Sequence, residues 1–319
     1  MNDVAEDRYR DIELRIDDPV AVLRLNRPEK LNAFTYDTLA EIRSAITTAA
    51  ADPKVVGIVI TGNGRGFCAG LDAQTLAAVT SEGGARRRVE SRQGIAGGPA
   101  APVSSPVTTS GGAGDPLPKE DELPGLFTYL LEVPKPIIAA VNGVAAGGGV
   151  VLASMCDVRF ASTAASFTTI FLKRGLVAEH GTTWILPRLM SPGRALDLLW
   201  TSDRIDGETA HRIGLVEHLT EPSELVERAC DYVRRIAASA SPASVADTKR
   251  MVYRHLGVGY PEALREADRV QWAAVGRPDA AEGAKALLER REPRFRRLGE
   301  ASPAPPITPR GTPRLGAND

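Results

Sequence analysis

The N-terminal part of the chain shows the two-residue period of paired strands. Apolar and charged residues alternate over 12–16, the sequence DDP at 17–19 interrupts the pattern, and VAVLRL at 20–25 resumes it. Such alternation is typical of half-buried strands, and an Asp-Pro break is typical of a turn. We therefore expect a β-hairpin at this end of the chain.

Helical and strand patterns then alternate. Leu39, Ile42, Ile46 and Ala49 recur at helical spacing, and VVGIVIT at 55–61 is a continuous apolar run typical of a buried strand. A second round follows, with a helix expected over 124–132, a strand over 137–141 and a helix within 147–155. From residue 192 to about 297 the pattern is largely helical, and no internal sequence repeat is evident. Strands that alternate with helices predict an α/β core.

Three segments have compositions that favour disorder. Residues 80–119 are rich in Gly, Ser, Pro and Ala and have few large apolar side chains to bury, which predicts a disordered insertion, with a lid over a site as the alternative. Residues 1–10 are expected to be flexible, and the proline-rich residues 298–319 are expected to form a disordered tail. The folded remainder divides into a core over 11–200 and a helical region over 201–297.

Composition excludes several classes of function. The chain has 39 Lys and Arg against 40 Asp and Glu, so it lacks the basic excess of a nucleic-acid-binding protein. Its three cysteines have no CxxC or Cys/His spacing, which argues against a disulfide framework and a metal site. The N-terminus has no apolar signal, and the apolar stretch 137–153 is interrupted by Asn-Gly and is shorter than the ~20 residues of a spanning helix. We expect a cytoplasmic protein with no membrane segment.

Two glycine-containing turns are candidates for chemistry. TGNGRGFCAGLD at 61–72 and VNGVAAGGGVVLA at 141–153 each join an apolar strand to the start of a predicted helix. Glycine lets a backbone approach a ligand closely, and free N–H groups at a helix start attract negative charge, so the two turns could form a two-donor oxyanion hole. The first turn lacks the spacing of a nucleotide-binding loop, and the glycine triplet at 147–149 could equally serve tight helix packing.

The sequences of these two turns, together with LNRPEKLNAF at 25–34 and GLVAEHGTTWILPRLM at 175–190, resemble the sequence motifs of the crotonase superfamily. This superfamily is also called the enoyl-CoA hydratase/isomerase family. The resemblance covers about residues 10–297. It implies an α/β fold in which repeated ββα units form a spiral core, followed by a helical C-terminal region, and assembly as a homo-trimer or hexamer. It also implies acyl-CoA thioester substrates with no separate cofactor, because coenzyme A is part of the substrate.

The resemblance assigns roles by motif position. The enolate oxygen formed at the thioester would accept hydrogen bonds from the backbone N–H groups of Leu71 and Gly148. The residues that it places near coenzyme A are Arg27, Lys30, Leu31, Ala33, Ala69 and Asp72.

The acid and base groups depart from the hydratase pattern. Where the hydratases of the family have two glutamates, this chain has Val151 and Phe171, which would line the acyl site. Glu179 instead matches the single base of peroxisomal-type Δ3,Δ2-enoyl-CoA isomerases. From spacing alone, Glu179 could simply complement the dipole of a helix that starts near Thr182, and His180 could either orient the base or be an ordinary loop histidine.

We therefore expect an enzyme that shifts a double bond of an enoyl-CoA through an oxyanion-stabilised enolate, with Glu179 as its one base. One alternative is an enoyl-CoA hydratase or an acyl-CoA hydrolase that uses a non-standard second group. An alternative from another class is a catalytically weak acyl-CoA binding protein, favoured by the apolar residues Val151 and Phe171.

Overall fold

The structure is a computed structural model that describes residues 9–81 and 125–300. The predicted insertion at 80–119, the flexible residues 1–10 and the tail at 298–319 fall almost entirely outside this part of the chain.

The N-terminal elements follow their hydrophobic patterns. Strands β1 (Ile12–Asp17) and β2 (Val20–Leu25) form the predicted antiparallel hairpin. Helix α1 (Tyr36–Ala51) begins at a capping box made by Thr35 and Thr38 and buries the face that carries Ile42 and Ile46. The predicted buried strand is β3 (Gly57–Gly62), which starts two residues later than its apolar run and is buried along its whole length.

The strands form two sheets. The larger sheet has the order β1-β2-β3-β5-β7-β10, in which β5 (Ile137–Val141), β7 (Val158–Ser162) and β10 (His218–Thr220) continue the parallel part. The smaller sheet has the order β4-β6-β8-β9 and consists of β4 (Gly66–Cys68), β6 (Val144–Ala146), β8 (Ser166–Thr168) and β9 (Ile205–Asp206). Both sheets thus take their last strand from beyond residue 200.

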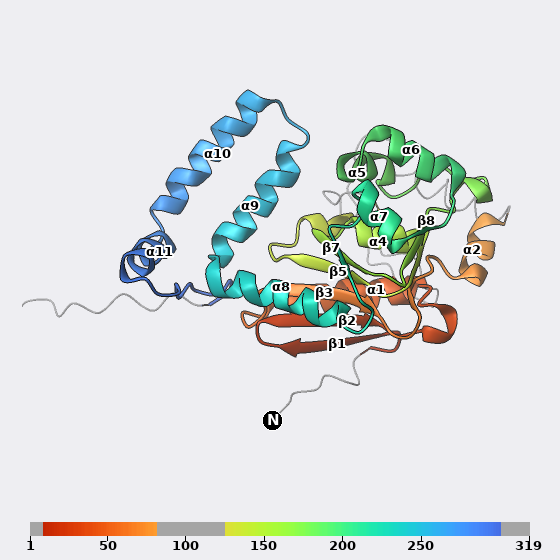
Figure 1. Cartoon of the computed structure of the whole chain (residues 1–319), viewed down its shortest axis with the longest axis horizontal. Helices are drawn as coiled ribbons and strands as arrows, with labels where there is room; N and C mark the ends of the chain where they lie inside the picture. Colours follow the sequence, from red (N-terminus) through yellow and green to blue (C-terminus); the bar gives the residue numbers. More distant parts are fainter. Residues whose placement is uncertain (1–8, 82–124, 301–319) are drawn as a thin grey trace, which may run out of the picture.

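Three successive strand pairs explain the two sheets. In β3-β4, β5-β6 and β7-β8, the first strand joins the large sheet and the second joins the small one. Figure 1 labels β3, β5 and β7 of the large sheet and β8 of the small one. Helix α2 (Ala73–Thr80) follows the first pair and helix α4 (Gly148–Ser154) follows the second. This is the predicted spiral of ββα units, repeated in the backbone although the sequence shows no repeat.

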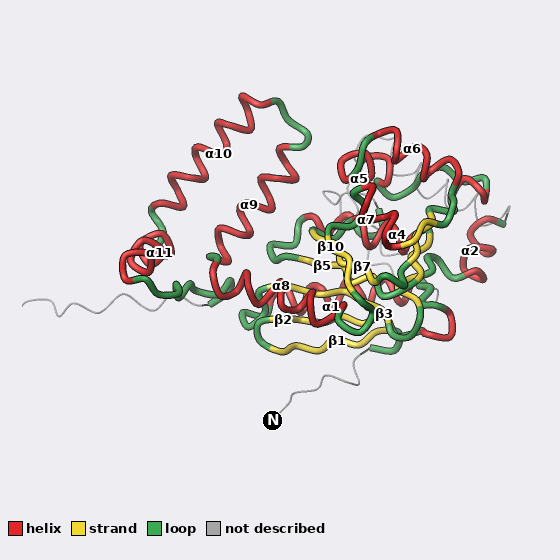
Figure 2. Tube along the Cα trace, in the orientation of Figure 1, coloured by secondary structure: helices red, strands yellow, loops and turns green. Residues whose placement is uncertain are grey.

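Both faces of the large sheet are covered. On one face, α8 (Leu225–Ser239) lies against the strands (Figure 2), and its Ala229 and Val233 share a buried cluster with Val59 and Ile138. The other face forms a continuous core with α1, α4 and the small sheet, and Phe34, Phe67 and Phe127 are fully buried in it. The core therefore lies directly beneath the turns that connect the two sheets.

One of the predicted helices does not form as an α-helix. Residues 124–132 were expected to be helical, but only the short 3₁₀ helix η2 (Thr128–Leu131) forms there. Gly125 has φ +137°, and Pro134 and Pro136 follow closely, so too few residues remain for a longer helix. Two apolar residues of this segment, Phe127 and Leu130, are buried in the core.

The remaining elements form two helical groups. The first follows β8 and contains η3 (Leu172–Arg174), α5 (Thr182–Leu189), α6 (Pro192–Thr201) and α7 (Gly207–Ile213). The second contains α9 (Pro242–His255), α10 (Tyr260–Val275) and α11 (Pro278–Glu289), which extend away from the sheets (Figure 1). Across residues 9–81 and 125–300, no helix combines the length and the apolar character needed to span a bilayer.

Candidate active site

The first glycine turn leads from β4 into α2. Gly70 has φ +89°, and a Cβ there would lie 2.7 Å from the Ala146 carbonyl oxygen and 3.1 Å from the Gly148 nitrogen. The two glycine turns are thus packed against each other with no room for a side chain at Gly70. The Phe34 N–H donates to the Gly70 carbonyl at 2.8 Å, and the Asp72 N–H donates to the Phe34 carbonyl at 2.9 Å. Because Leu71 is the residue between these two bonds, its own N–H faces away from Phe34.

The second glycine turn starts α4. Gly147 has φ +50° and donates its N–H to the Thr168 carbonyl, so the helix begins at Gly148, within the triplet. An N–H in the first turn of a helix has no intrahelical acceptor. Among the described residues, neither the Leu71 N–H nor the Gly148 N–H donates to a protein oxygen. Two unused backbone donors therefore lie on adjoining turns.

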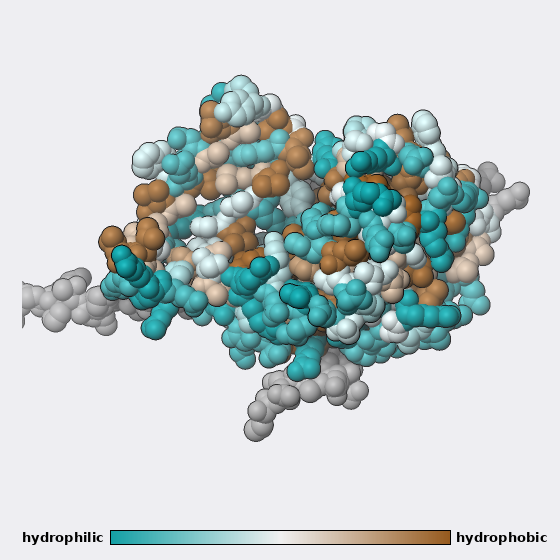
Figure 3. Space-filling model, in the orientation of Figure 1, coloured by the Kyte–Doolittle hydropathy of each residue, from teal (hydrophilic) through white to brown (hydrophobic). Residues whose placement is uncertain are grey.

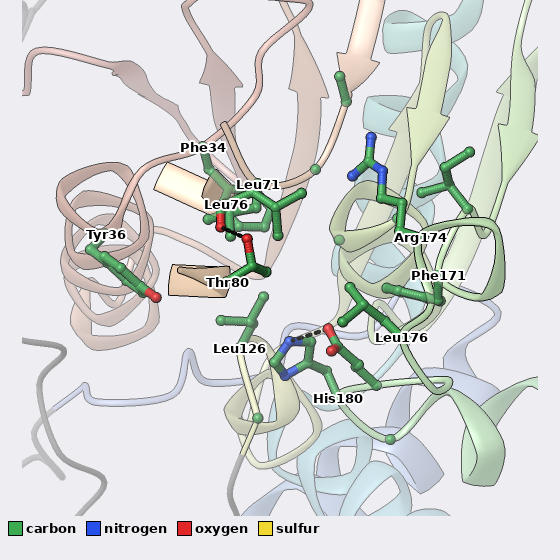
Figure 4. A pocket seen from close by; sticks show the side chains of 18 residues that line it. Phe34, Tyr36, Leu71, Leu76, Thr80, Leu126, Phe171, Arg174, Leu176 and His180 are labelled. Carbon is green, nitrogen blue, oxygen red and sulfur yellow. Dashed lines mark hydrogen bonds and ion pairs between the residues drawn. The ribbon is translucent and has the colours of Figure 1, made fainter. Parts of the chain in front are cut away.

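Both turns open onto a cavity of about 520 Å³ (Figure 4), which is a suitable size for a small-molecule ligand. Its lining is mainly apolar. The larger apolar side chains that line it are Phe34, Leu71, Leu76, Leu126, Ile170, Phe171 and Leu176. Three side chains that can carry charge also line it: Arg174, Glu179 and His180.

Glu179 lies in the loop between η3 and α5. Its carbonyl oxygen accepts from the N–H of Thr182 at 3.0 Å and from its hydroxyl at 2.8 Å. These bonds fix the loop where α5 begins, at Thr182 as predicted, after Gly181 in the left-handed region. One Glu179 carboxylate oxygen lies 3.5 Å from His180 Nε2, the contact drawn as a dashed line in Figure 4. The Glu179 side chain is 34% exposed, so a ligand in the cavity can reach it.

The two residues that the resemblance places at the hydratase glutamate positions lie differently. Phe171 forms part of the cavity wall, whereas Val151 is fully buried within α4 and does not line the cavity. Cys68 lies behind the first turn, and burial raises the pKa of its thiol to about 12. This cysteine is therefore a neutral packing residue at physiological pH rather than a nucleophile.

Of the residues predicted near coenzyme A, Ala69 alone lines the cavity. Arg27 and Asp72 instead brace the first turn: an Arg27 guanidinium N–H donates to the Ala33 carbonyl at 2.5 Å, and another guanidinium nitrogen lies 3.6 Å from the Asp72 carboxylate. That carboxylate accepts from the backbone N–H of Gln74 and caps α2. Lys30 is exposed, and Leu31 adopts the left-handed region beside it.

Two asparagines that the sequence analysis did not single out hold the first turn in place. Asn32 Nδ2 donates to the Gly66 carbonyl at 2.7 Å, and Asn142 Nδ2 donates to the same carbonyl at 3.2 Å. Asn142 also accepts from the Gly62 N–H through its side-chain oxygen. The Asn-Gly pair at 142–143 is a turn signal visible in the sequence, but the partner across the turn is set by the tertiary fold.

No metal centre is formed by the described residues. Within 9–81 and 125–300, no three His, Cys, Asp or Glu side chains are grouped so that they could hold a metal ion.

Comparisons with known proteins agree on one family. Residues 15–95 and 117–298 match the family model described as enoyl-CoA hydratase/isomerase. The chain is 32% identical to the crotonyl-CoA hydratase of Syntrophomonas wolfei over 90% of this chain and 98% of the relative. It is 30% identical to the 1,2-epoxyphenylacetyl-CoA isomerase of Escherichia coli over 86% of this chain and 94% of the relative. Among solved structures, the enoyl-CoA hydratase of Bacillus anthracis matches with a TM-score of 0.75 and 26% identity, covering 91% of this chain and all of that one.

Proposed function

Because the chain belongs to the enoyl-CoA hydratase/isomerase family and has its crotonase fold, we propose that it shifts the double bond of an enoyl-CoA. At the level of the family, the chain is an enzyme that acts on acyl-CoA. Similar relatives include both a hydratase and an isomerase, so the choice of reaction rests on the site itself.

The proposed mechanism uses the two glycine turns and one carboxylate. The thioester oxygen of a 3-enoyl-CoA accepts hydrogen bonds from the N–H groups of Leu71 and Gly148. The Glu179 carboxylate removes a proton from C2, which gives a dienolate whose negative charge these donors stabilise. The protonated Glu179 then returns the proton to C4, and the double bond moves from C3–C4 to C2–C3.

One observation carries this proposal. Glu179 supplies the only carboxylate among the described residues that line the cavity with the two free N–H groups. Isomerisation needs a single group that first accepts and then donates a proton, whereas hydration by the usual pair of glutamates needs two. The two positions of that pair are occupied by Val151 and Phe171.

A second candidate reaction is hydration. The His180 imidazole lies 3.5 Å from the Glu179 carboxylate and lines the same cavity, so it supplies a second group able to carry a proton. Such a pair could position and activate water on an enoyl-CoA. The reaction products separate the two candidates, because only hydration gives a 3-hydroxyacyl-CoA.

The Glu179→Gln variant tests the assignment of the base. We expect the rate of 3-enoyl to 2-enoyl conversion to fall by more than ~100-fold, because an amide cannot take up the C2 proton. The dissociation constant for a saturated acyl-CoA should change little, since the cavity keeps its shape. Glu208→Gln, at an exposed position of α7, is the matched control and should keep the native rate. A native rate in Glu179→Gln would contradict the proposal.

A further inference from the structure

Among the described residues that line the cavity, Arg174 is a cation without a protein partner. Arg174 is the last residue of η3, and its side chain lies on the same wall as Phe171, opposite Tyr36 and Thr80 (Figure 4). Among the described residues, no oxygen accepts a hydrogen bond from its guanidinium and no carboxylate lies within ion-pair distance of it. Glu179, the one acidic side chain in the lining, is paired with His180 instead.

The local backbone explains why Arg174 faces the cavity. The Arg174 N–H donates to the carbonyl of Phe171 at 3.0 Å, and Gly175 then turns the chain in the left-handed region at φ +70°. The neighbouring Lys173 faces away from the cavity, where its ammonium donates to the Ser202 carbonyl at 3.1 Å and lies 3.2 Å from the Asp203 carboxylate. Lys173 thus makes contacts within the protein, whereas the neighbouring Arg174 faces the cavity.

Charge and desolvation then define the ligand group. A guanidinium carries five N–H donors and no acceptor, and it stays charged at any physiological pH. Arg174 is exposed at the cavity, so its donors stay hydrated unless a ligand covers them, and a ligand that covers them binds well only if it supplies an acceptor. A planar anion such as a carboxylate, or a phosphate, matches the donor geometry and gives charge-assisted hydrogen bonds.

We propose that Arg174 binds a carboxylate carried by the acyl chain of the acyl-CoA. This inference rests on the proposed function, because it takes an acyl-CoA as the ligand of the cavity. Arg174 would then be a specificity-determining residue that acts on binding and takes no part in the proton transfer.

Titration calorimetry with three non-reacting ligands tests the inference on the full chain. The ligands are coenzyme A, butyryl-CoA, which has a neutral acyl group, and glutaryl-CoA, which has a terminal carboxylate. Each is measured with the native protein, with Arg174→Gln and with Lys173→Gln as the matched control. The conservative variant Arg174→Lys, which keeps the charge and loses the planar fork, should give an intermediate affinity.

The two sources of the anion give different results. If Arg174 binds an acyl carboxylate, Arg174→Gln weakens glutaryl-CoA by about tenfold and leaves coenzyme A and butyryl-CoA unchanged. If it binds a phosphate of coenzyme A instead, all three ligands weaken by a similar factor, which would overturn the inference. Native affinity of Arg174→Gln for all three ligands would overturn the inference, as would an equal loss in Lys173→Gln. Failure of the native protein to bind any of them would overturn the proposed function itself, which is a distinguishable result.

Discussion

At the residue scale, the two proposed oxyanion donors can lie close together because Gly70 and Gly148 have no side chains. A Cβ at Gly148 would lie 2.4 Å from Cζ of Phe34, whose ring is held edge to face against Phe127 at 5.7 Å between centroids. Phe34 is fully buried, so its ring cannot move aside at low cost. The rigid aromatic pair therefore fixes where the start of α4 lies against the first turn.

Gly148→Ala should displace one donor from its position. We expect the rate of C2 proton exchange or isomerisation to fall by about 10²–10³-fold, the usual effect of losing one oxyanion-hole donor. Steady-state kinetics with a 3-enoyl-CoA measures the rate, and circular dichroism checks that the variant is folded. Gly193→Ala is the control, because a Cβ there meets nothing within 4 Å, and it should keep the native rate. Native activity in Gly148→Ala would contradict the role of this N–H.

The sequence was most informative about residues whose signal is local. Leu71, Gly148 and Glu179 lie within contiguous motifs, and the structure brings all three to one cavity. The roles of Arg174 and the Asn32 amide could not be predicted, because a lone arginine or asparagine has no distinctive spacing in the sequence. The contacts that give them meaning, such as the Asn32 bond to the Gly66 carbonyl, join residues far apart in the chain.

At the element scale, a buried polar cluster attaches α9 to the sheet core. The Lys249 ammonium lies 2.8 Å from the Asp157 carboxylate and donates to the Leu130 carbonyl at 3.0 Å. The Tyr253 hydroxyl donates to the other Asp157 oxygen at 2.8 Å. Burial lowers the pKa of Lys249, and the nearby Asp157 carboxylate opposes that shift by favouring the charged amine. The buried Lys249 charge is therefore favourable only while the Asp157 carboxylate is beside it, and the pair then holds α9 against the core.

Asp157→Asn should destabilise the protein by about 3–5 kcal/mol, because it leaves the Lys249 charge buried without its partner. Lys249→Met should cost less, since an apolar side chain of similar length removes the charge as well. Urea denaturation gives the free energy of unfolding of each variant. Glu224→Gln breaks an exposed pair with Arg228 on α8 and should cost less than about 1 kcal/mol. An equally small cost for Asp157→Asn would show that the cluster does not hold α9.

Helices and strands with a clear hydrophobic period could be predicted from the sequence, whereas strands of two or three residues could not. The hairpin, α1 and β5 follow patterns that extend over at least five residues. The strands of the small sheet contain two or three residues each, too few for a period to be seen. For the same reason the repeated ββα unit is plain in the backbone but hidden in the sequence.

At the scale of the whole molecule, the C-terminal helices carry an apolar stripe that the described residues leave exposed. Tyr260, Leu264, Trp272 and Val275 lie along one side of α10 and are all more than half exposed. Figure 3 shows apolar residues at the surface of this region. A contiguous exposed apolar surface commonly marks a protein interface. We propose that a second copy of the chain covers it within the homo-trimer or hexamer expected from the sequence.

Light scattering coupled to size exclusion tests this assembly. The native protein should have a mass three or six times that of the 33.9 kDa chain, and the double variant Leu264→Glu, Trp272→Glu should have a smaller one. The control Arg269→Glu changes an exposed residue outside the stripe and should keep the native mass. A native protein of 33.9 kDa would refute the proposed assembly.

The most direct test of the whole account is incubation of the native protein with a 3-enoyl-CoA in D₂O, followed by NMR. We predict that the 2-enoyl-CoA forms, that deuterium enters C2 and C4 as the proton held by the partly exposed Glu179 carboxyl exchanges with the solvent, and that no 3-hydroxyacyl-CoA appears. These results share one cause. Glu179 carries a proton between C2 and C4, and the N–H groups of Leu71 and Gly148 stabilise the enolate. Formation of the 3-hydroxyacyl-CoA as the main product, or an unchanged substrate with no exchange at C2, would contradict the account.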